Sequence, residues 1–320
     1  MNTKINYDTE LLDIKTGEII PVQSGTKIVS PANQKRRKDY AIKESQKEIF
    51  KGENEAYQTT LDLRGNFFSI LCSEINPLWE NVSEPTLGKL VYLATFMDKN
   101  NCICFDGNWS REIVDGKETR CRVPKPMSKE DIRISLGINK KSFYYFWKEC
   151  IEKELITEKE DSFYLPKDQF RFCDNSGINK KKTRMPKLFK HAIRYMYENT
   201  DEHSKRTLVH LYRLIPFINM TYNGLCLNPF EMDKNKIKPL SLGKICDILG
   251  IDRSNQSYFL KKLKKLRFID KQGTVCSVIR YSWLYYDEDV YWITINPQFY
   301  SGYISESAMV EMVDDFREEK

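Results

Sequence analysis

Residues 253–257 read Arg-Ser-Asn-Gln-Ser, an unbroken run of side chains that can form hydrogen bonds. Arginine pairs with guanine through two hydrogen bonds, and asparagine or glutamine pairs with adenine in the same way. The lysines that follow could reach phosphate groups, which adds affinity without reading sequence. The sequence therefore predicts base contacts from Arg253, Ser254, Asn255, Gln256 and Ser257, and phosphate contacts from Lys261, Lys262, Lys264 and Lys265.

The elements that would position this run are two short helices joined by a turn. Ser241 can cap the first helix, Gly250 permits a tight turn, and Asp252 can cap the second helix, which carries the run on its outer face. Phe268 and Ile269 begin a strand of a hairpin. This order predicts a winged helix-turn-helix, whose second helix enters the major groove.

The same segment occurs twice in the chain. Residues 126–156 align without a gap to residues 239–269, and ten of the 31 pairs are identical. Repeats of this kind indicate a duplicated structural unit. In the first copy Asn139 caps the second helix, and the outward residues that predict DNA contact are Lys140, Lys141, Ser142 and Tyr144.

The two copies differ in charge. The second helix of the first copy carries Glu149, Glu152 and Glu154, so it is less basic than its counterpart. We therefore expect the second copy to make the stronger contact with duplex DNA. The first copy either binds DNA more weakly or contacts protein. Gln256 occupies the place of the inward Phe143, an anomaly that the sequence does not explain.

Flanking elements also follow one order in both halves. An apolar helix, a strand-like segment, the repeated segment and a closing strand appear in each half, which predicts a mainly α fold with small β wings, built from tandem winged helix-turn-helix modules. The expected segments are a charged N-terminal extension with a hairpin and a helix (1–60), a first module (61–173), a basic linker (174–185), a second module (186–304) and a C-terminal helix (305–320). In the linker, phosphate contacts are predicted from Lys180, Lys181 and Lys182.

These halves resemble a known family of replication proteins. The turns GINK (137–140) and GIDR (250–253), the helix ends at residues 155–156 and 268–269, and the Asn-Pro at 296–297 are similar to the winged-helix replication proteins of small firmicute plasmids, the RepL-like group, and to related phage regulators. The resemblance covers roughly residues 66–172 and 186–302. Those proteins usually carry one such module, whereas this chain carries two. The resemblance implies DNA binding on a plasmid or phage.

Residue types for catalysis are sparse. A P-loop motif and a His-x-His pair are both missing from the sequence, which argues against an ATPase and a metal-dependent nickase. His191-x-x-Arg194 and His210-x-x-Arg213 are fragments of a tyrosine recombinase site, with Tyr300 and Tyr303 as tyrosines that could attack phosphate. Both fragments lie in apolar-periodic helices. We expect no enzyme activity, no metal and no cofactor.

The composition of the chain indicates its cellular environment and its class of partner. The formal net charge of +6 is compatible with nucleic acid. Nine cysteines without a C-x-x-C spacing indicate buried thiols in a reducing cytosol, so we expect a cytoplasmic protein. The longest apolar run, 208–220, is interrupted by charged residues and proline, which predicts no membrane span. The apolar stripe of the C-terminal helix favours packing on its own module over a second subunit.

Together these features predict sequence-specific binding of double-stranded DNA. The first hypothesis is a replication initiator that binds repeated origin sites and recruits host replication machinery. The second is a transcriptional regulator that binds an operator and acts on the transcription machinery. The third is an architectural protein that uses one module for DNA and the other for protein. A homodimer is one further arrangement that the sequence allows.

Overall fold

The computed structural model describes residues 11–12, 19–20, 66–72, 82–114, 117–172, 184–283, 291–302, 312–313 and 315–317. The chain divides into two compact units, Met1–Asn54 and Glu55–Lys320. In the first unit β1 (Leu11–Leu12) pairs antiparallel with β2 (Ile19–Ile20), in the segment where a hairpin is predicted. The predicted N-terminal helix and the linker lysines Lys180, Lys181 and Lys182 lie outside the described residues.

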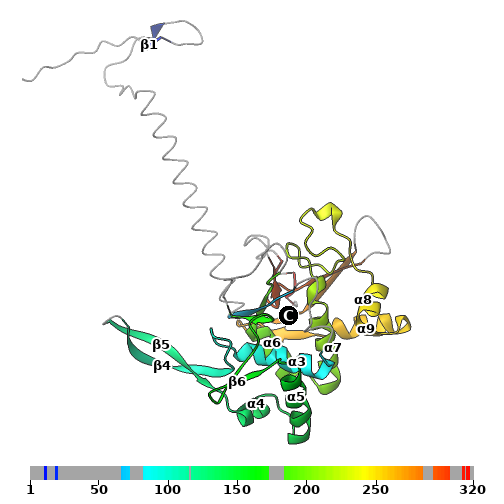
Figure 1. Cartoon of the computed structure of the whole chain (residues 1–320). Helices are drawn as coiled ribbons and strands as arrows, with labels where there is room; N and C mark the ends of the chain where they lie inside the picture. Colours follow the sequence, from blue (N-terminus) through cyan, green and yellow to red (C-terminus); the bar gives the residue numbers. More distant parts are fainter. Residues whose placement is uncertain are drawn as a thin grey trace, which may run out of the picture. The chain divides into compact units, whose positions relative to one another are not determined.

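The second unit contains both helices and strands, which follow one another in short runs along the chain (Figure 1). Its named helices are α3 (Glu84–Leu93), α4 (Lys129–Ser135), α5 (Lys140–Glu152), α6 (Lys190–Asn199), α7 (Glu202–Arg213), α8 (Leu242–Leu249) and α9 (Gln256–Leu263). Its named strands are β3 (Phe67–Ile70), β4 (Cys104–Val114), β5 (Lys117–Pro126), β6 (Thr157–Lys159), β7 (Ser162–Tyr164), β8 (Phe170–Arg171), β9 (Lys187–Phe189), β10 (Arg267–Ile269), β11 (Val275–Ser277), β12 (Ile279–Trp283), β13 (Tyr291–Ile295) and β14 (Tyr300–Ser301).

The predicted fold class, mainly α with small β wings in tandem winged helix-turn-helix modules, is wrong. Among the described residues, strands contain nearly as many residues as α-helices, and they form one four-stranded sheet and several two-stranded sheets. The prediction underestimated the number of residues in strands, because a short apolar run does not show which distant segment it pairs with. The fold is a mixture of α and β structure.

The two halves of the chain share the four-stranded sheet. Its strand order is β14-β9-β3-β8, so each half contributes one central and one outer strand. The central strands β3 and β9 pair antiparallel, with Phe68 opposite Leu188. Phe68, Ile70 and Leu188 are fully buried and belong to one core cluster that runs through both halves. The halves are therefore joined by a common sheet and a common core.

Helices α3 and α7 form the second contact between the halves. Each is followed by a 3-10 turn of three residues, Ala94–Phe96 and Ile215–Phe217. Counting back from these turns places Gly88 and Val209 at equivalent positions. A Cβ atom on Gly88 would lie 2.7 Å from Val209 Cγ2, closer than van der Waals contact allows. The missing side chain at Gly88 lets the two helices approach each other closely.

Replacing Gly88 with alanine should lower the free energy of unfolding by about 1–3 kcal/mol, because the added methyl group overpacks the contact with Val209. The double variant Gly88→Ala, Val209→Ala should recover part of the loss, since the two residues then share the space. Urea denaturation of the wild type, both single variants and the double variant measures this coupling. Strict additivity of the two single effects would contradict the close approach of α3 and α7.

Both halves also contain the same buried turn. Asn101 and Asn223 have positive φ values of 67° and 52°, and their side chains are buried. The Asn101 amide donates to the carbonyls of Leu165 and Phe170 at 3.2 and 2.7 Å. The Asn223 amide likewise donates to two main-chain carbonyls of the second half. This shared device supports the duplication that the repeated segment indicated.

The C-terminal segment packs on its own chain. Val313 and Phe316 are buried, and the Ser277 amide donates to the Phe316 carbonyl at 2.9 Å. Arg317 forms an antiparallel bridge with Cys276 of β11. In the described part of the chain, helices fall short of the length and apolar character needed to cross a bilayer.

Candidate nucleic-acid interface

The repeated segments form two matching helix–turn–helix units, each followed by a hairpin. In the first unit α4 and α5 precede the hairpin β6–β7, and in the second unit α8 and α9 precede β10–β11. Gly137 and Gly250 have φ values of +65° and +67°, the left-handed conformation that glycine adopts without strain. Ile132 and Ile245 are fully buried in both units. The predicted turn and its core contacts are confirmed.

Helix caps are present in both units, at Ser241 and Asn139 as predicted and also at Ser128, the equivalent of Ser241. Ser128 accepts a hydrogen bond from the Asp131 amide, and Ser241 accepts one from the Lys244 amide. Asn139 caps α5 by accepting a bond from the Ser142 amide at 2.8 Å. Each cap satisfies a main-chain donor that the first turn of a helix leaves unpaired. These caps fix where α4, α5 and α8 begin.

The start of the second helix of the second unit differs from the prediction. Asp252 caps a 3-10 turn at Arg253–Asn255, and the α-helix begins only at Gln256. Gln256 is exposed, and a Cβ on Gly243 would lie 3.9 Å from its Oε1 atom. Gln256 therefore lies beside α8 at the surface and does not enter the core as Phe143 does. This placement accounts for the Phe143/Gln256 anomaly.

The predicted base-contact residues of the second unit lie together on its surface. Arg253, Ser254, Asn255, Gln256 and Ser257 are all exposed. Two of them are held by neighbouring carboxylates. The hydroxyl of Ser254 donates to Asp252 at 2.7 Å, and the Arg253 guanidinium is described next.

Arg253 forms an ion pair with Asp247 of α8. Its Nε and Nη2 atoms donate to the two carboxylate oxygens at 2.8 and 2.6 Å. The Arg253 guanidinium lowers the pKa of the Asp247 carboxyl below its usual value. The guanidinium fork that would pair with guanine is therefore already occupied by a carboxylate of similar geometry.

The predicted phosphate-contact lysines follow along α9 and the turn after it. Lys261, Lys264 and Lys265 are exposed, whereas Lys262 is half-buried. Lys262 Nζ lies 4.5 Å from the centre of the Tyr258 ring. Lys264 Nζ lies 4.0 Å from the centre of the Tyr281 ring, which belongs to β12. The four ammonium groups give this face its positive charge.

The first unit presents a less basic face. Lys140, Lys141, Ser142 and Tyr144 are exposed on α5, as predicted. Further along the helix Lys148 pairs with Glu152 at 3.7 Å, so acidic groups offset its charge. The exposed face of α5 is thus weaker in positive charge than the face of α9.

Ser142 also lines a cavity of about 450 Å³. The cavity walls come from both halves: Gly88 lies on α3, and Lys205 and Val209 lie on α7. Ser142 is consequently at the edge between the outer face of α5 and the contact with α7.

Glu149 attaches α5 to the start of α3. Its carboxylate accepts hydrogen bonds from the Ser83 amide and hydroxyl at 2.9 and 2.6 Å and from the Thr86 hydroxyl at 2.6 Å. Lys153 Nζ donates to it at 2.8 Å. Partial burial raises the pKa of Glu149, but the bonds from Lys153, Ser83 and Thr86 outweigh burial and hold that pKa at about 2. Glu149, which the sequence singled out only for its charge, therefore positions α5 against the start of α3.

Replacing Glu149 with glutamine should lower the free energy of unfolding by about 1–2 kcal/mol at pH 7, since solvent screens part of the interaction. The pKa is lowered on folding, so this stability is present above the ordinary pKa of 4.5 and is lost as the pH falls towards about 2. Urea denaturation at pH 7 and pH 3 should show a smaller variant effect at pH 3. Glu152→Gln is the control. An equal loss of unfolding free energy in this variant would show that Glu149 does not hold α5 against α3.

Two exposed tyrosines were not among the predicted contact residues. Tyr145 and Tyr258 occupy the same position in the two units, and each has 60% of its surface exposed. They are among the identical pairs of the repeat. An aromatic residue that is identical in both copies and yet does not face the core was the available signal. Their hydroxyl groups could donate to phosphate oxygens.

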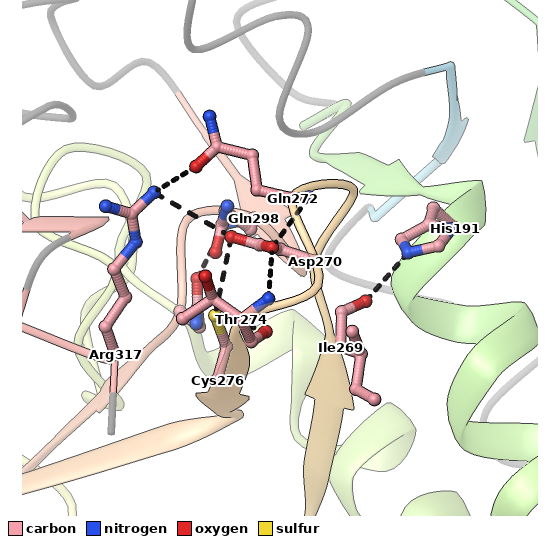
Figure 2. A network of polar contacts seen from close by, with 9 residues as sticks. His191, Ile269, Asp270, Gln272, Thr274, Cys276, Gln298 and Arg317 are labelled. Atoms are coloured by element: carbon pink, nitrogen blue, oxygen red, sulfur yellow. Dashed lines mark hydrogen bonds and ion pairs between the residues drawn. The ribbon is translucent and has the colours of Figure 1, made fainter. Parts of the chain in front are cut away.

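The hairpin after α9 is fixed by a buried carboxylate (Figure 2). Asp270 accepts hydrogen bonds from the amides of Gln272 and Thr274, both at 2.9 Å. Arg317 of the C-terminal segment lies 3.8 Å from Asp270 and donates to Gln272 Oε1 at 3.2 Å. On the other side, His191 of α6 donates to the Ile269 carbonyl at 2.7 Å. These contacts hold the second unit against the shared core.

The two His-x-x-Arg fragments make contacts within the fold. Arg194 donates to the hydroxyl and carbonyl of Thr95 at 2.9 and 2.8 Å. His210 and Arg213 both face Glu84, at 3.3 and 3.7 Å. Tyr300 is fully buried and its hydroxyl faces the Ile218 carbonyl at 3.5 Å, while Tyr303 lies outside the described residues.

Seven cysteines in the described ranges are buried thiols, as the prediction of structural burial requires. The described residues contain no group of three or more His, Cys, Asp or Glu placed to hold a metal ion.

Comparison of the chain with protein-family models, with curated proteins and with solved structures gives no match in any of the three.

Proposed function

We propose that this chain binds double-stranded DNA through the exposed faces of α5 and α9. One observation carries the proposal: the chain builds the same helix–turn–helix twice, each is followed by a hairpin, and each copy presents exposed polar side chains at the start of its second helix. A second helix of this kind fits the major groove with its N-terminal residues towards base edges. Arg253 and Asn255 suit guanine and adenine, and Lys261 and Lys265 suit phosphates.

The ion pair of Arg253 with Asp247 gives a test of this assignment. Asp247→Asn should raise duplex affinity about two- to fivefold, because Arg253 no longer has to break an ion pair with a carboxylate before it contacts DNA. Exposed ion pairs contribute about 0.2–1 kcal/mol, which corresponds to this range of affinity. Fluorescence anisotropy with a labelled duplex measures the change. Asp233→Asn removes the same charge from a pair with Lys236 elsewhere and should leave affinity within twofold. Unchanged or weaker binding by Asp247→Asn would show that Arg253 does not approach the DNA.

Footprinting on the DNA that flanks the protein's own gene, at two salt concentrations, tests the proposal as a whole. Protection of an array of repeats would favour a replication initiator, with host replication proteins as partners. A single site over a promoter would favour a transcriptional regulator. Absence of protection at low salt would refute DNA binding and leave a protein-contact role for both units.

A further inference from the structure

We infer that one chain occupies one duplex site made of two unlike half-sites in inverted orientation. The inference rests on the proposed DNA binding and adds the geometry of the target. It follows from the arrangement of the two helix–turn–helix units around the elements that join the halves, and from the residues that differ between the units.

The first step is a two-fold relation within the chain. Strands β3 and β9 pair antiparallel at the centre of the shared sheet, and β8 and β14 flank them in the same way. Helices α3 and α7 meet at the equivalent positions Gly88 and Val209. An antiparallel pair of equivalent strands and a contact of equivalent helix positions are what a two-fold axis generates. The halves are therefore related as the subunits of a symmetric dimer are.

The second step extends this relation to the outer helices. In the first half Lys89 of α3 lies 5.8 Å from the centre of the Phe146 ring of α5. In the second half the equivalent residue, His210 of α7, lies 5.7 Å from the equivalent ring, Phe259 of α9. Figure 1 shows α3 and α7 between the α4–α5 pair and the α8–α9 pair. Each reading helix thus packs on its central helix in the same way, so the two-fold relation carries α5 onto α9.

Duplex DNA has matching symmetry, because its two strands run in opposite directions. Proteins with a two-fold axis accordingly read half-sites in inverted orientation, separated by about 10 base pairs or a multiple of that spacing. When a duplex lies perpendicular to the two-fold axis, the two units contact it in the same orientation relative to the local strand direction. A direct repeat would require one unit to turn around relative to the other, which the shared sheet prevents.

The half-sites differ in sequence, because the residues at the reading positions differ. Residues 140–144 and 253–257 occupy the same places in the two units, and none of the five pairs is identical. The framework around them is kept: Gly137 matches Gly250, and Phe146 matches Phe259. Two units with one framework and different reading residues recognise different bases in the same geometry. The complex therefore has a direction along the DNA, and one chain fills the site without a second copy.

The experiment begins with selection of preferred duplexes from a random pool by the full-length protein. The variant Arg253→Ala, Asn255→Ala should relax base preference in one half of the selected site only, and Lys140→Ala, Tyr144→Ala in the other half only. These variants identify the half-sites. Three labelled duplexes are then compared: the selected site, the site with one half-site reversed, and the site with one half-site scrambled.

The expected result is a complex of one chain per selected duplex, and affinity that falls at least about tenfold when either half-site is reversed or scrambled. Equal affinity for the selected and reversed sites, or two chains per site, would overturn the inference while leaving DNA binding in place. Failure to enrich any duplex at low salt would refute the proposed function itself. A preference confined to the half read by α9 would also overturn the inference, since α5 would then make no base contact.

Discussion

Replacing Asn223 with alanine should lower the free energy of unfolding by about 3–5 kcal/mol. The Asn223 amide donates to the carbonyls of Ile295 and Tyr300 at 3.2 and 2.8 Å, and its side chain is fully buried. Its loss leaves two buried carbonyls without this donor, at a cost of about 1–3 kcal/mol each. Alanine also tolerates the positive φ of 52° less well than asparagine does. Urea denaturation followed by circular dichroism measures the loss.

Two further variants separate the causes. Asn223→Gly removes the same hydrogen bonds but accepts the positive φ, so it should cost less than alanine. Asn199→Ala is the control, because Asn199 is exposed and donates to a single carbonyl within its own helix, and it should cost under about 1 kcal/mol. Asn101→Ala should match Asn223→Ala, since both halves use the same turn. A loss below about 1 kcal/mol for both would contradict the shared device.

Replacing Lys261, Lys264 and Lys265 together with glutamine should weaken duplex binding on the order of 100-fold at 0.1 M salt. Each lysine that neutralises a phosphate contributes about 0.9 to the slope of log affinity against log salt concentration, so the slope should become shallower by about 2.7. The loss should be similar for preferred and random duplexes, because phosphate contacts carry no sequence information. Anisotropy titrations at several salt concentrations measure both quantities.

The matched control removes three charges elsewhere. Lys167, Lys234 and Lys236 are exposed and lie outside α8 and α9. Their replacement with glutamine changes the net charge equally, and it should alter affinity less than about threefold. If both triple variants lost affinity equally, binding would depend on net charge alone and α9 would have no special part.

Local features of the candidate interface were predictable from the sequence. The serine cap Ser241, the asparagine cap Asn139 and the turn glycines Gly137 and Gly250 follow from neighbouring residues, and each is confirmed, whereas Asp252 caps a 3-10 turn instead of the predicted helix. Such features depend on chain geometry within one or two turns, which sequence patterns encode directly. The order of elements in the two halves was also readable, because it follows the repeat.

Long-range features were not predictable in the same way. The pairing of β3 with β9 joins segments about 120 residues apart in the chain, and neither short apolar run specifies its partner. The ion pair of Arg253 with Asp247 and the hold of Glu149 on α3 depend on side-chain geometry that periodicity does not describe. The mixed fold class and the two-fold relation between the halves could therefore be recognised only in the structure.

Site-specific crosslinking tests the proposed interface most directly. A photo-crosslinking amino acid is introduced at Ser257 on α9, at Tyr144 on α5 and, as the control, at Lys167, and each protein is irradiated with its preferred duplex. We expect crosslinks to DNA from Ser257 and Tyr144, in opposite halves of the site, and none from Lys167. Crosslinks from Lys167 alone, or equal yields from all three positions, would contradict DNA binding through α5 and α9.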